Sequence, residues 1–259
     1  MKPIGCHLIL ALVGRRVLAP TTVAKRTLVT SIAWFAVEYR ILLFHAPDTH
    51  LHIVAACDRM AAGRLAQRLE TSLRGALALS VPFRPAEIIE VSAQSHLRSL
   101  VDYVLGQDRH HGVIADGYHE ASVLLDLLGL RCIAPLAGPT LRSLLPRLAR
   151  RELLEHLGVG DLAPGSSPQL LASSTEAALA LPSLHGRAAP VLAARTAAVA
   201  VGRDLGLRTE RIAELLQVSD RTVQRPSREG PRPELVRAVR LQMGLRERLG
   251  VRDGSRSGS

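Results

Sequence analysis

The sequence predicts an α+β domain followed by an all-helical region. In the first 115 residues, short apolar runs alternate with longer segments whose leucines recur at helical spacing. Their order is strand, helix, strand, strand, helix, strand, helix, which is typical of an antiparallel sheet with helices on one face. The rest of the chain has helical patterns only, interrupted by stretches rich in proline, glycine and serine.

The first elements are bounded by turn and capping residues. Thr21 or Thr22 is expected to cap the first helix, with Lys25 and Arg26 on its outer side, and Asp58 is expected to cap the second helix. The predicted strands cover residues 4–13, 40–45, 49–56 and 86–91, and the predicted helices between them cover 21–39 and 59–79.

The charge balance indicates a polyanionic partner. Lysine and arginine total 33 against 23 acidic residues, which gives a net charge of +10 and a sequence pI of about 10.8. A chain this basic favours nucleic acid first and a membrane surface second. The three cysteines include no C-x-x-C pair, which favours a reducing cytoplasm over a disulfide framework or a zinc ribbon.

The N-terminal segment is not predicted to be a targeting signal. Its apolar run is short, Arg15 and Arg16 close it, and no small-residue cleavage site follows. No stretch reaches the roughly 18 apolar residues that a membrane-spanning helix requires. We therefore expect a soluble, cytoplasmic protein without a membrane partner.

Two histidines in the third predicted strand form the first candidate site. Side chains alternate along a strand, so His50 and His52 are expected on one face, and Leu51 and Ile53 in the core. Two histidines whose Cα atoms are about 6 to 7 Å apart, as the strand rise requires, can share one divalent ion. The alternative is a pair of histidines on the solvated face of a strand. His45, at the end of the neighbouring strand, is expected at the rim of the site or on the surface.

Tyr103 and Gln107 form the second candidate. Leu97, Leu100, Val101 and Val104 recur at helical spacing and should face a core, which leaves Tyr103 and Gln107 together on another face. A phenol can act as a nucleophile on a phosphodiester, and an amide oxygen one turn away can serve as a neutral metal ligand. The alternative is a half-buried tyrosine at a helix edge beside a solvated glutamine.

These residues together resemble a known family. The segment 48–54, the Tyr103-x-x-x-Gln107 helix and the distance between them resemble the single-tyrosine HUH transposases of the IS200/IS605 group, in particular the REP-associated tyrosine transposases. The resemblance extends over about residues 1–115. It implies a ferredoxin-like or RRM-like core, with the tyrosine helix against the histidine strand of the same chain or of a partner in a homodimer.

The resemblance also implies a mechanism. Mg²⁺ or Mn²⁺ would be held by His50, His52 and Gln107 and would polarise a phosphate of single-stranded or hairpin DNA. Tyr103 would attack the phosphorus and form a 5′-phosphotyrosine intermediate. On the helix 59–79, Arg64 and Arg68 project away from the leucines and could follow the DNA backbone, or form a solvated face.

The chain after residue 115 is predicted to be helical. A basic connector and linker cover 116–175, a helical domain covers 176–250, and residues 251–259 are expected to be disordered. Within the helical domain, the spacing around Ser219 is expected of a helix-turn-helix, and the segment resembles modules that some of the transposase relatives carry. A plain helical bundle is the alternative. The predicted recognition-helix residues are Arg221, Thr222, Gln224 and Arg225.

We therefore predict a DNA-binding, transposase-like enzyme associated with the nucleoid. The first alternative is a domesticated, non-cleaving DNA-binding regulator on the same scaffold. The short 81–85 loop favours it, as does Pro226, which would stop the recognition helix. A second alternative is an RNA-binding RRM-like module, which an aromatic content of 3% disfavours because such sheets stack bases on aromatic side chains.

Overall fold

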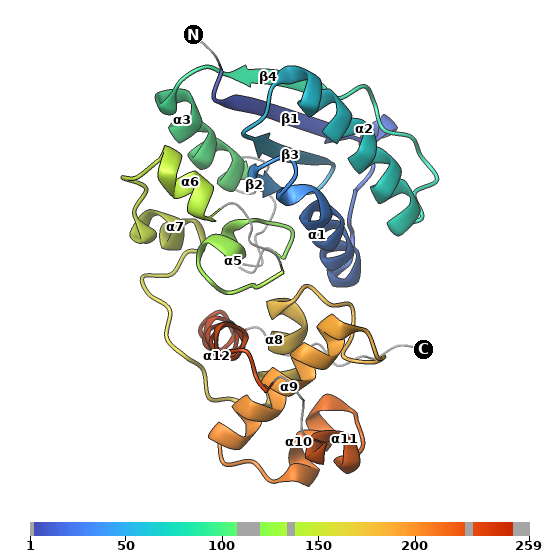
Figure 1. Ribbon diagram of the computed structural model, residues 1–259, viewed down its shortest axis with the longest axis vertical. Helices are drawn as coiled ribbons and strands as arrows, with labels where there is room; N and C mark the ends of the chain where they lie inside the picture. The colour runs from blue at the N-terminus through green and yellow to red at the C-terminus, as the bar shows by residue number, and fades with distance from the viewer. Residues whose placement is uncertain (1–2, 108–119, 134–137, 226–229, 251–259) are drawn as a thin grey trace. The chain divides into compact units, whose positions relative to one another are not determined.

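The computed structural model describes residues 3–107, 120–133, 138–225 and 230–250, and the chain divides into two compact units (Figure 1). The first unit comprises Met1–Leu128 and Ile133–Gly158, and the second comprises Gly129–Cys132 and Val159–Ser259. The division near residue 158 falls inside the range predicted as a connector. The helices before it belong with the sheet, and the second unit takes up the helical segments after it.

The first unit is built on a four-stranded sheet in the order β2-β3-β1-β4, in which every neighbouring pair is antiparallel. The predicted α+β class is confirmed, and each predicted strand is present with slightly shorter bounds. The strands are β1 (Gly5–Ala11), β2 (Ile41–His45), β3 (His50–Ala55) and β4 (Glu87–Val91). The helices of this unit are α1 (Thr22–Ala36), α2 (Arg59–Ala76), α3 (Gln94–Leu105), α5 (Leu124–Leu127), α6 (Gly138–Leu144) and α7 (Arg150–His156).

The strands of the sheet centre have one apolar face and one face that carries histidines. Side chains alternate between the two faces along each strand, and residues opposite each other on β1 and β3 point to the same face. We call one side the leucine face, defined by Leu8, Leu10, Leu51 and Ile53, all with 0% exposure. We call the other the histidine face, defined by His7, His45, His50 and His52.

Helices α1 and α2 lie together on one side of the sheet, and α3 lies on the other side (Figure 1). Each of α1 and α2 connects two strands that run in the same direction with one strand between them, and right-handed crossovers place both helices on one face. They therefore cover the leucine face, while α3 follows β4 and covers the histidine face. The burial of Leu51 and Ile53 confirms the side predicted for them.

Both predicted helix caps are present. The Thr21 hydroxyl accepts a hydrogen bond from the backbone N–H of Ala24 at 3.1 Å, and the Asp58 carboxylate accepts one from the N–H of Ala61 at 2.8 Å. These side chains satisfy N–H groups that have no partner within the helix, so the start of each helix is fixed by its sequence.

The prediction for Arg26 is wrong. The sequence predicts it on the outer side of α1, but its side chain is buried and forms a two-point ion pair with Glu120. Arg26 Nε lies 2.5 Å from Glu120 Oε2, and Nη2 lies 2.9 Å from Oε1. A guanidinium can be buried when a carboxylate matches its fork geometry, and the partner lies 94 residues away, beyond the reach of a local pattern.

The two edges of the sheet differ. Along β2, the chain around Ser122 adds backbone hydrogen bonds, from Ala46 N–H to Ala121 O at 3.1 Å and from Val123 N–H to Phe44 O at 2.9 Å. The β4 edge carries exposed Glu87 and Glu90 instead. Charged residues on an open strand discourage pairing with other chains.

The second unit is all-helical around its own apolar core. Helix α12 packs against α8 and α9, and α10 packs against α8, α9 and α11. Gly165 allows a close approach to α12, because a Cβ at this position would lie 2.3 Å from the backbone nitrogen of Gly244. The helices are α8 (Leu171–Ala178), α9 (Ala189–Asp204), α10 (Thr209–Leu216), α11 (Asp220–Gln224) and α12 (Pro233–Arg248). Helix α8 begins inside the range predicted as linker.

Helices α10 and α11 are joined by the turn predicted at 217–219. Gln217 ends α10 in the left-handed conformation with φ of 54°, and Ser219 precedes α11. Helix α11 ends at Gln224, and the predicted stop at Pro226 and the predicted disorder of residues 251–259 lie outside the described residues. Among the helices that the structure describes, none is both long enough and apolar enough to span a bilayer.

Candidate active site

Helix α3 covers the histidine face. On a solvated strand face, the alternative given by the sequence, these histidines would be exposed. His52 has an exposed fraction of 1% and lies opposite Ile9 on β1 and His45 on β2. His45 is also 1% exposed, so its predicted place at the rim or on the surface is wrong. The burial follows from the α3 helix and the chain around Ser122, which close over this side of β2.

The two histidines of the predicted pair lie side by side. Their ring centroids are 4.6 Å apart and the ring planes are nearly perpendicular, at 80°. His50 is half-buried, and its Nδ1 lies 3.3 Å from the Thr49 hydroxyl. Strand β3 therefore presents two imidazoles to one side, as the spacing predicts.

Tyr103 lies edge-on to His52, one member of this pair. Its ring centroid is 5.5 Å from that of His52, with an interplanar angle of 82°. Helix α3 is held in place by buried apolar side chains on its inner side, and Tyr103 sits at the margin of that side with 48% of its surface exposed. A tyrosine and a histidine 51 positions apart in sequence thus meet in one cluster, and the tyrosine stays accessible from solvent.

Gln107 lies one turn beyond Tyr103 and is buried, with an exposed fraction of 1%. Its amide nitrogen donates to the backbone carbonyl of Tyr103 at 3.0 Å. Within the described residues, no three His, Cys, Asp or Glu side chains are arranged to hold a metal ion. A metal at the His50–His52 pair would therefore need a ligand of another type, and the predicted one is the amide oxygen of Gln107, two residues after the end of α3.

His7 is a member of the cluster that the sequence analysis missed. It lies on β1 with 3% exposure, and its Nε2 shares a hydrogen bond of 3.0 Å with Nδ1 of His52. The two rings stack with centroids 5.2 Å apart. Burial, with the nearby charge of His96, lowers the pKa of His7 from its ordinary 6.5 to about 4, so His7 is neutral near pH 7. A histidine within an otherwise apolar strand gave no spacing signal.

The structure does not bring Arg64 and Arg68 to this cluster. Both lie on α2, which covers the leucine face. The Arg68 guanidinium donates to the Glu38 carboxylate at 2.5 Å and to the Tyr39 hydroxyl at 3.0 Å, and it lies 4.8 Å from the ring centre of Phe35. Arg64 is exposed.

The four residues predicted for DNA recognition lie on and just after α11 in the second unit. Arg221, Gln224 and Arg225 are exposed, and Thr222 is half-buried with its hydroxyl 2.9 Å from that of Ser219. Val223 points into the core of the unit, which fixes the helix. The polar residues therefore lie on the side of α11 that faces solvent.

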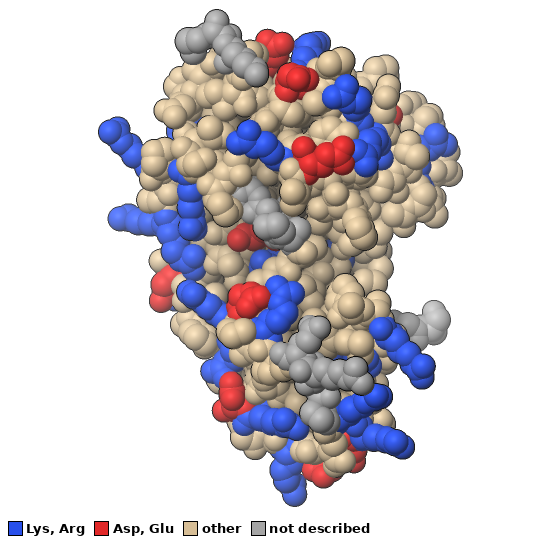
Figure 2. All heavy atoms as spheres, in the orientation of Figure 1, with Lys and Arg blue, Asp and Glu red and all other residues tan. Residues whose placement is uncertain are grey.

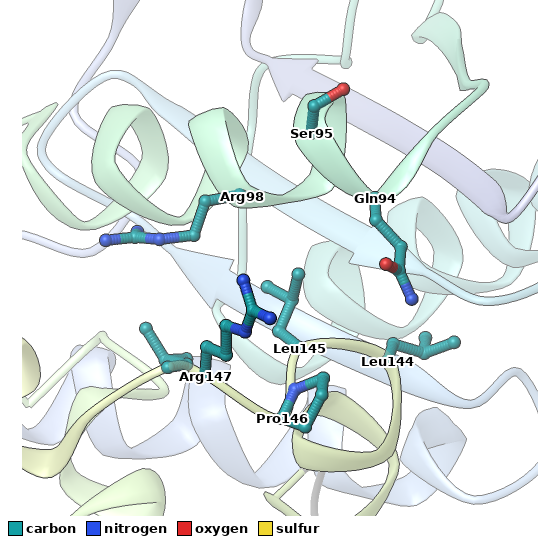
Figure 3. A pocket seen from close by; sticks show the side chains of 8 residues that line it. Gln94, Ser95, Arg98, Leu144, Leu145, Pro146 and Arg147 are labelled. Carbon is teal, nitrogen blue, oxygen red and sulfur yellow. The ribbon is translucent and has the colours of Figure 1, made fainter.

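A cavity of about 570 Å³ lies on the other flank of α3. Figure 3 shows Arg98 and Gln94 on α3 facing Leu145 and Arg147 on the segment after α6. Arg98 pairs with Glu152 and, at 3.0 Å, with Asp102. Along α3, Arg98 and Tyr103 are five residues apart and so point in different directions. The cavity is distinct from the histidine–tyrosine cluster.

Basic side chains are spread over both units. On the face shown in Figure 2, lysine and arginine side chains lie on both units, and acidic ones are scattered among them. The net charge of +10 is thus a property of the whole chain and not of one tail. Comparison with models of known families, with curated proteins and with solved structures found no match to this chain.

Proposed function

We propose that this protein is a single-tyrosine HUH-type transposase or endonuclease that cleaves and rejoins single-stranded DNA. One observation carries the proposal: Tyr103 of α3 lies edge-on to His52, which in turn lies beside His50. A nucleophile and two imidazoles, which are common metal ligands, meet on one covered face, and the tyrosine remains open to a substrate.

The architecture supports the proposal at the level of the fold. The order strand, helix, strand, strand, helix, strand, with the sheet order β2-β3-β1-β4, is expected of a ferredoxin-like core. In the second unit, α10, the turn after Gln217 and α11 are expected to act as a helix-turn-helix. In that role, Arg221, Thr222, Gln224 and Arg225 would contact DNA.

The side chains present suit a divalent cation. Nδ1 of His52 is engaged with His7, so Nε2 is the nitrogen that His52 would offer to a metal. His50, His52 and the Gln107 amide oxygen would form a neutral ligand set, which leaves coordination positions for phosphate oxygens. When bound, Mg²⁺ or Mn²⁺ would supply Lewis-acid polarisation of the scissile phosphate.

Tyr103 would carry the covalent step. Its hydroxyl oxygen forms a bond to the phosphorus, the bond from phosphorus to the 3′ oxygen of the neighbouring nucleotide breaks, and the 3′ oxygen takes a proton. The phenol proton leaves to solvent, which reaches this half-exposed side chain. The 5′-phosphotyrosine bond keeps the energy of the cleaved bond, so attack by a 3′-hydroxyl can rejoin the strand.

The proposal is tested by trapping the adduct. Hairpin oligonucleotides from the DNA that flanks the gene, labelled at the 3′ end, are incubated with the full chain and Mn²⁺ and separated in SDS. We expect a covalent protein–DNA band that Tyr103→Phe and chelation both remove. Tyr39→Phe removes a phenol that the proposal does not use and should keep the band, so it is the matched control.

The result also separates the enzyme from the alternative regulator. Absence of a band from folded protein that still shifts the same hairpins in a gel would overturn the cleavage proposal. It would leave a DNA-binding regulator on the same scaffold.

A further inference from the structure

His7 occupies a position in the cluster that the proposed chemistry does not itself use. We infer that His7 is a positioning residue for His52: it accepts the Nδ1–H of His52 and thereby leaves Nε2 of His52 as the nitrogen that can bind a metal ion. The inference rests on the proposed function in so far as it gives His52 a metal to bind.

A single proton lies between the rings of His7 and His52 when both are neutral. A neutral imidazole has one N–H and one lone-pair nitrogen, so the 3.0 Å contact between His7 Nε2 and His52 Nδ1 has two arrangements. If His52 donates, its Nε2 carries a lone pair. If His7 donates, His52 carries its proton on Nε2 and cannot bind a cation there. The first arrangement alone suits a metal ligand.

The sheet fixes this contact in place. His7 lies opposite Val54 in the β1–β3 ladder, so it is the diagonal neighbour of His52 on the same face. Gly5, two residues earlier, admits the close approach of β3, because a Cβ there would lie 2.2 Å from the carbonyl oxygen of Ala55. Both rings are buried, at 3% and 1% exposure, so water does not compete for the hydrogen bond.

His7 is not a third ligand in this arrangement. Its Nε2 is directed at His52, and the described residues contain no three side chains of the His, Cys, Asp or Glu type that are placed to hold a metal ion. Its ring centroid lies 6.1 Å from that of Tyr103, with the rings at 79°. Its contact with the proposed ligand set is therefore through His52.

Two substitutions separate positioning from packing. His7→Gln places an amide group near the position of Nε2 and can still accept from His52. His7→Phe keeps an aromatic ring against His52 but removes the acceptor. A role in packing alone predicts that phenylalanine is the better replacement, whereas the positioning role predicts that glutamine is.

The first measurement is Mn²⁺ affinity, by calorimetric titration of the full chain at fixed pH. We expect His7→Phe to weaken Mn²⁺ binding by roughly 10- to 100-fold, the range typical of groups that orient metal ligands. His7→Gln should stay close to the wild type. Mn²⁺ binding by His7→Phe that equals the wild type, in a variant with an unchanged thermal unfolding midpoint, would overturn the inference.

The second measurement is nitrogen NMR of histidine side chains in the metal-free chain, with His52 assigned through His52→Gln. We expect a single His52 tautomer with its proton on Nδ1 in the wild type and in His7→Gln, and a mixture of tautomers in His7→Phe. A wild-type proton on Nε2 would overturn the inference. Because this readout needs no metal, it decides the role of His7 even if the wild type binds no Mn²⁺, a result that would count against the proposed function instead.

Discussion

The leucine face and the histidine face are built from the same strands but contribute different things to the molecule. On the leucine face, Leu8, Leu10, Leu51 and Ile53 are fully buried, and each such side chain contributes roughly 1.5 to 3 kcal/mol through removal of apolar surface from water. On the histidine face, the buried side chains include the imidazoles of His7, His45 and His52, whose desolvation costs free energy unless they are hydrogen-bonded.

The difference separates the face that stabilises the fold from the face on which the proposed chemistry would take place. Because side chains alternate along β3, Leu51 points into the apolar core, whereas His50 and His52 point to the face that α3 covers. A core needs apolar side chains only, so polar rings that face a covered side are expected where a site requires them. Substitutions on one face at a time can therefore separate the two contributions.

The largest effect is expected from the buried ion pair of α1, on the side of the leucine face. Arg26→Met leaves the Glu120 carboxylate buried without its guanidinium, which should lower the free energy of unfolding by about 3 to 5 kcal/mol in urea denaturation. The double variant Arg26→Met/Glu120→Leu removes both charges and should recover most of that loss. A loss below about 1 kcal/mol in the single variant would show that the pair is solvated.

The next effect compares neighbours on β3. Leu51→Ala should lower the free energy of unfolding by about 2 to 5 kcal/mol, because it leaves a cavity in the core. His50→Ala should cost less than about 1 kcal/mol, since this side chain is half-buried. Adduct formation, measured well below the unfolding temperature, should show the reverse order. Loss of the adduct in Leu51→Ala and its retention in His50→Ala would contradict the division between the faces.

The sequence predicts the leucine face better than the histidine face, and the reason is physical. Strand alternation and leucine spacing are local patterns, so the strands, the caps at Thr21 and Asp58 and the shared side of His50 and His52 could be read from neighbouring residues. The sequence also indicated Tyr103, through its place on an amphipathic helix.

The missed residues depend on contacts between distant segments. His7 joins His52 across 45 positions, and Arg26 joins Glu120 across 94, so neither pair has a spacing that a pattern can reveal. His45 was misplaced for the same reason: its burial depends on the chain at Ser122, which bridges to it from far along the sequence. Polar residues in apolar strands are the positions where such contacts should be sought.

A smaller effect is expected from pH. Burial holds the pKa of His7 at about 4, below the 6.5 of an unfolded chain, so the unfolded state binds the proton more tightly. The contribution of neutral His7 to the free energy of unfolding is fully present above pH 6.5 and is lost as the pH falls toward 4. With chelator present to remove metal ions, the free energy of unfolding of the wild type should fall by about 2 kcal/mol more than that of His7→Gln between pH 7 and pH 5.

Leu51→Ala is the control for this pH dependence, because its loss is expected to be the same at every pH. The free energy of unfolding of all three proteins is measured by urea denaturation at several pH values. If the wild type and His7→Gln gave parallel curves, His7 would titrate as a solvated histidine, and the covered state of the histidine face would be contradicted.

The smallest effect concerns DNA contacts from the side of the leucine face. Arg64 is exposed, whereas the Arg68 guanidinium is occupied by Glu38 and Tyr39. In the salt dependence of single-stranded DNA binding, Arg64→Ala should lower the slope by about 0.7, the value for one lost phosphate contact, and Arg68→Ala should leave it unchanged. Equal decreases would mean that DNA displaces Arg68 from its carboxylate. Two unchanged slopes would mean that DNA does not reach α2. The side of the sheet that carries the leucine face would then take part in neither the proposed chemistry nor DNA binding.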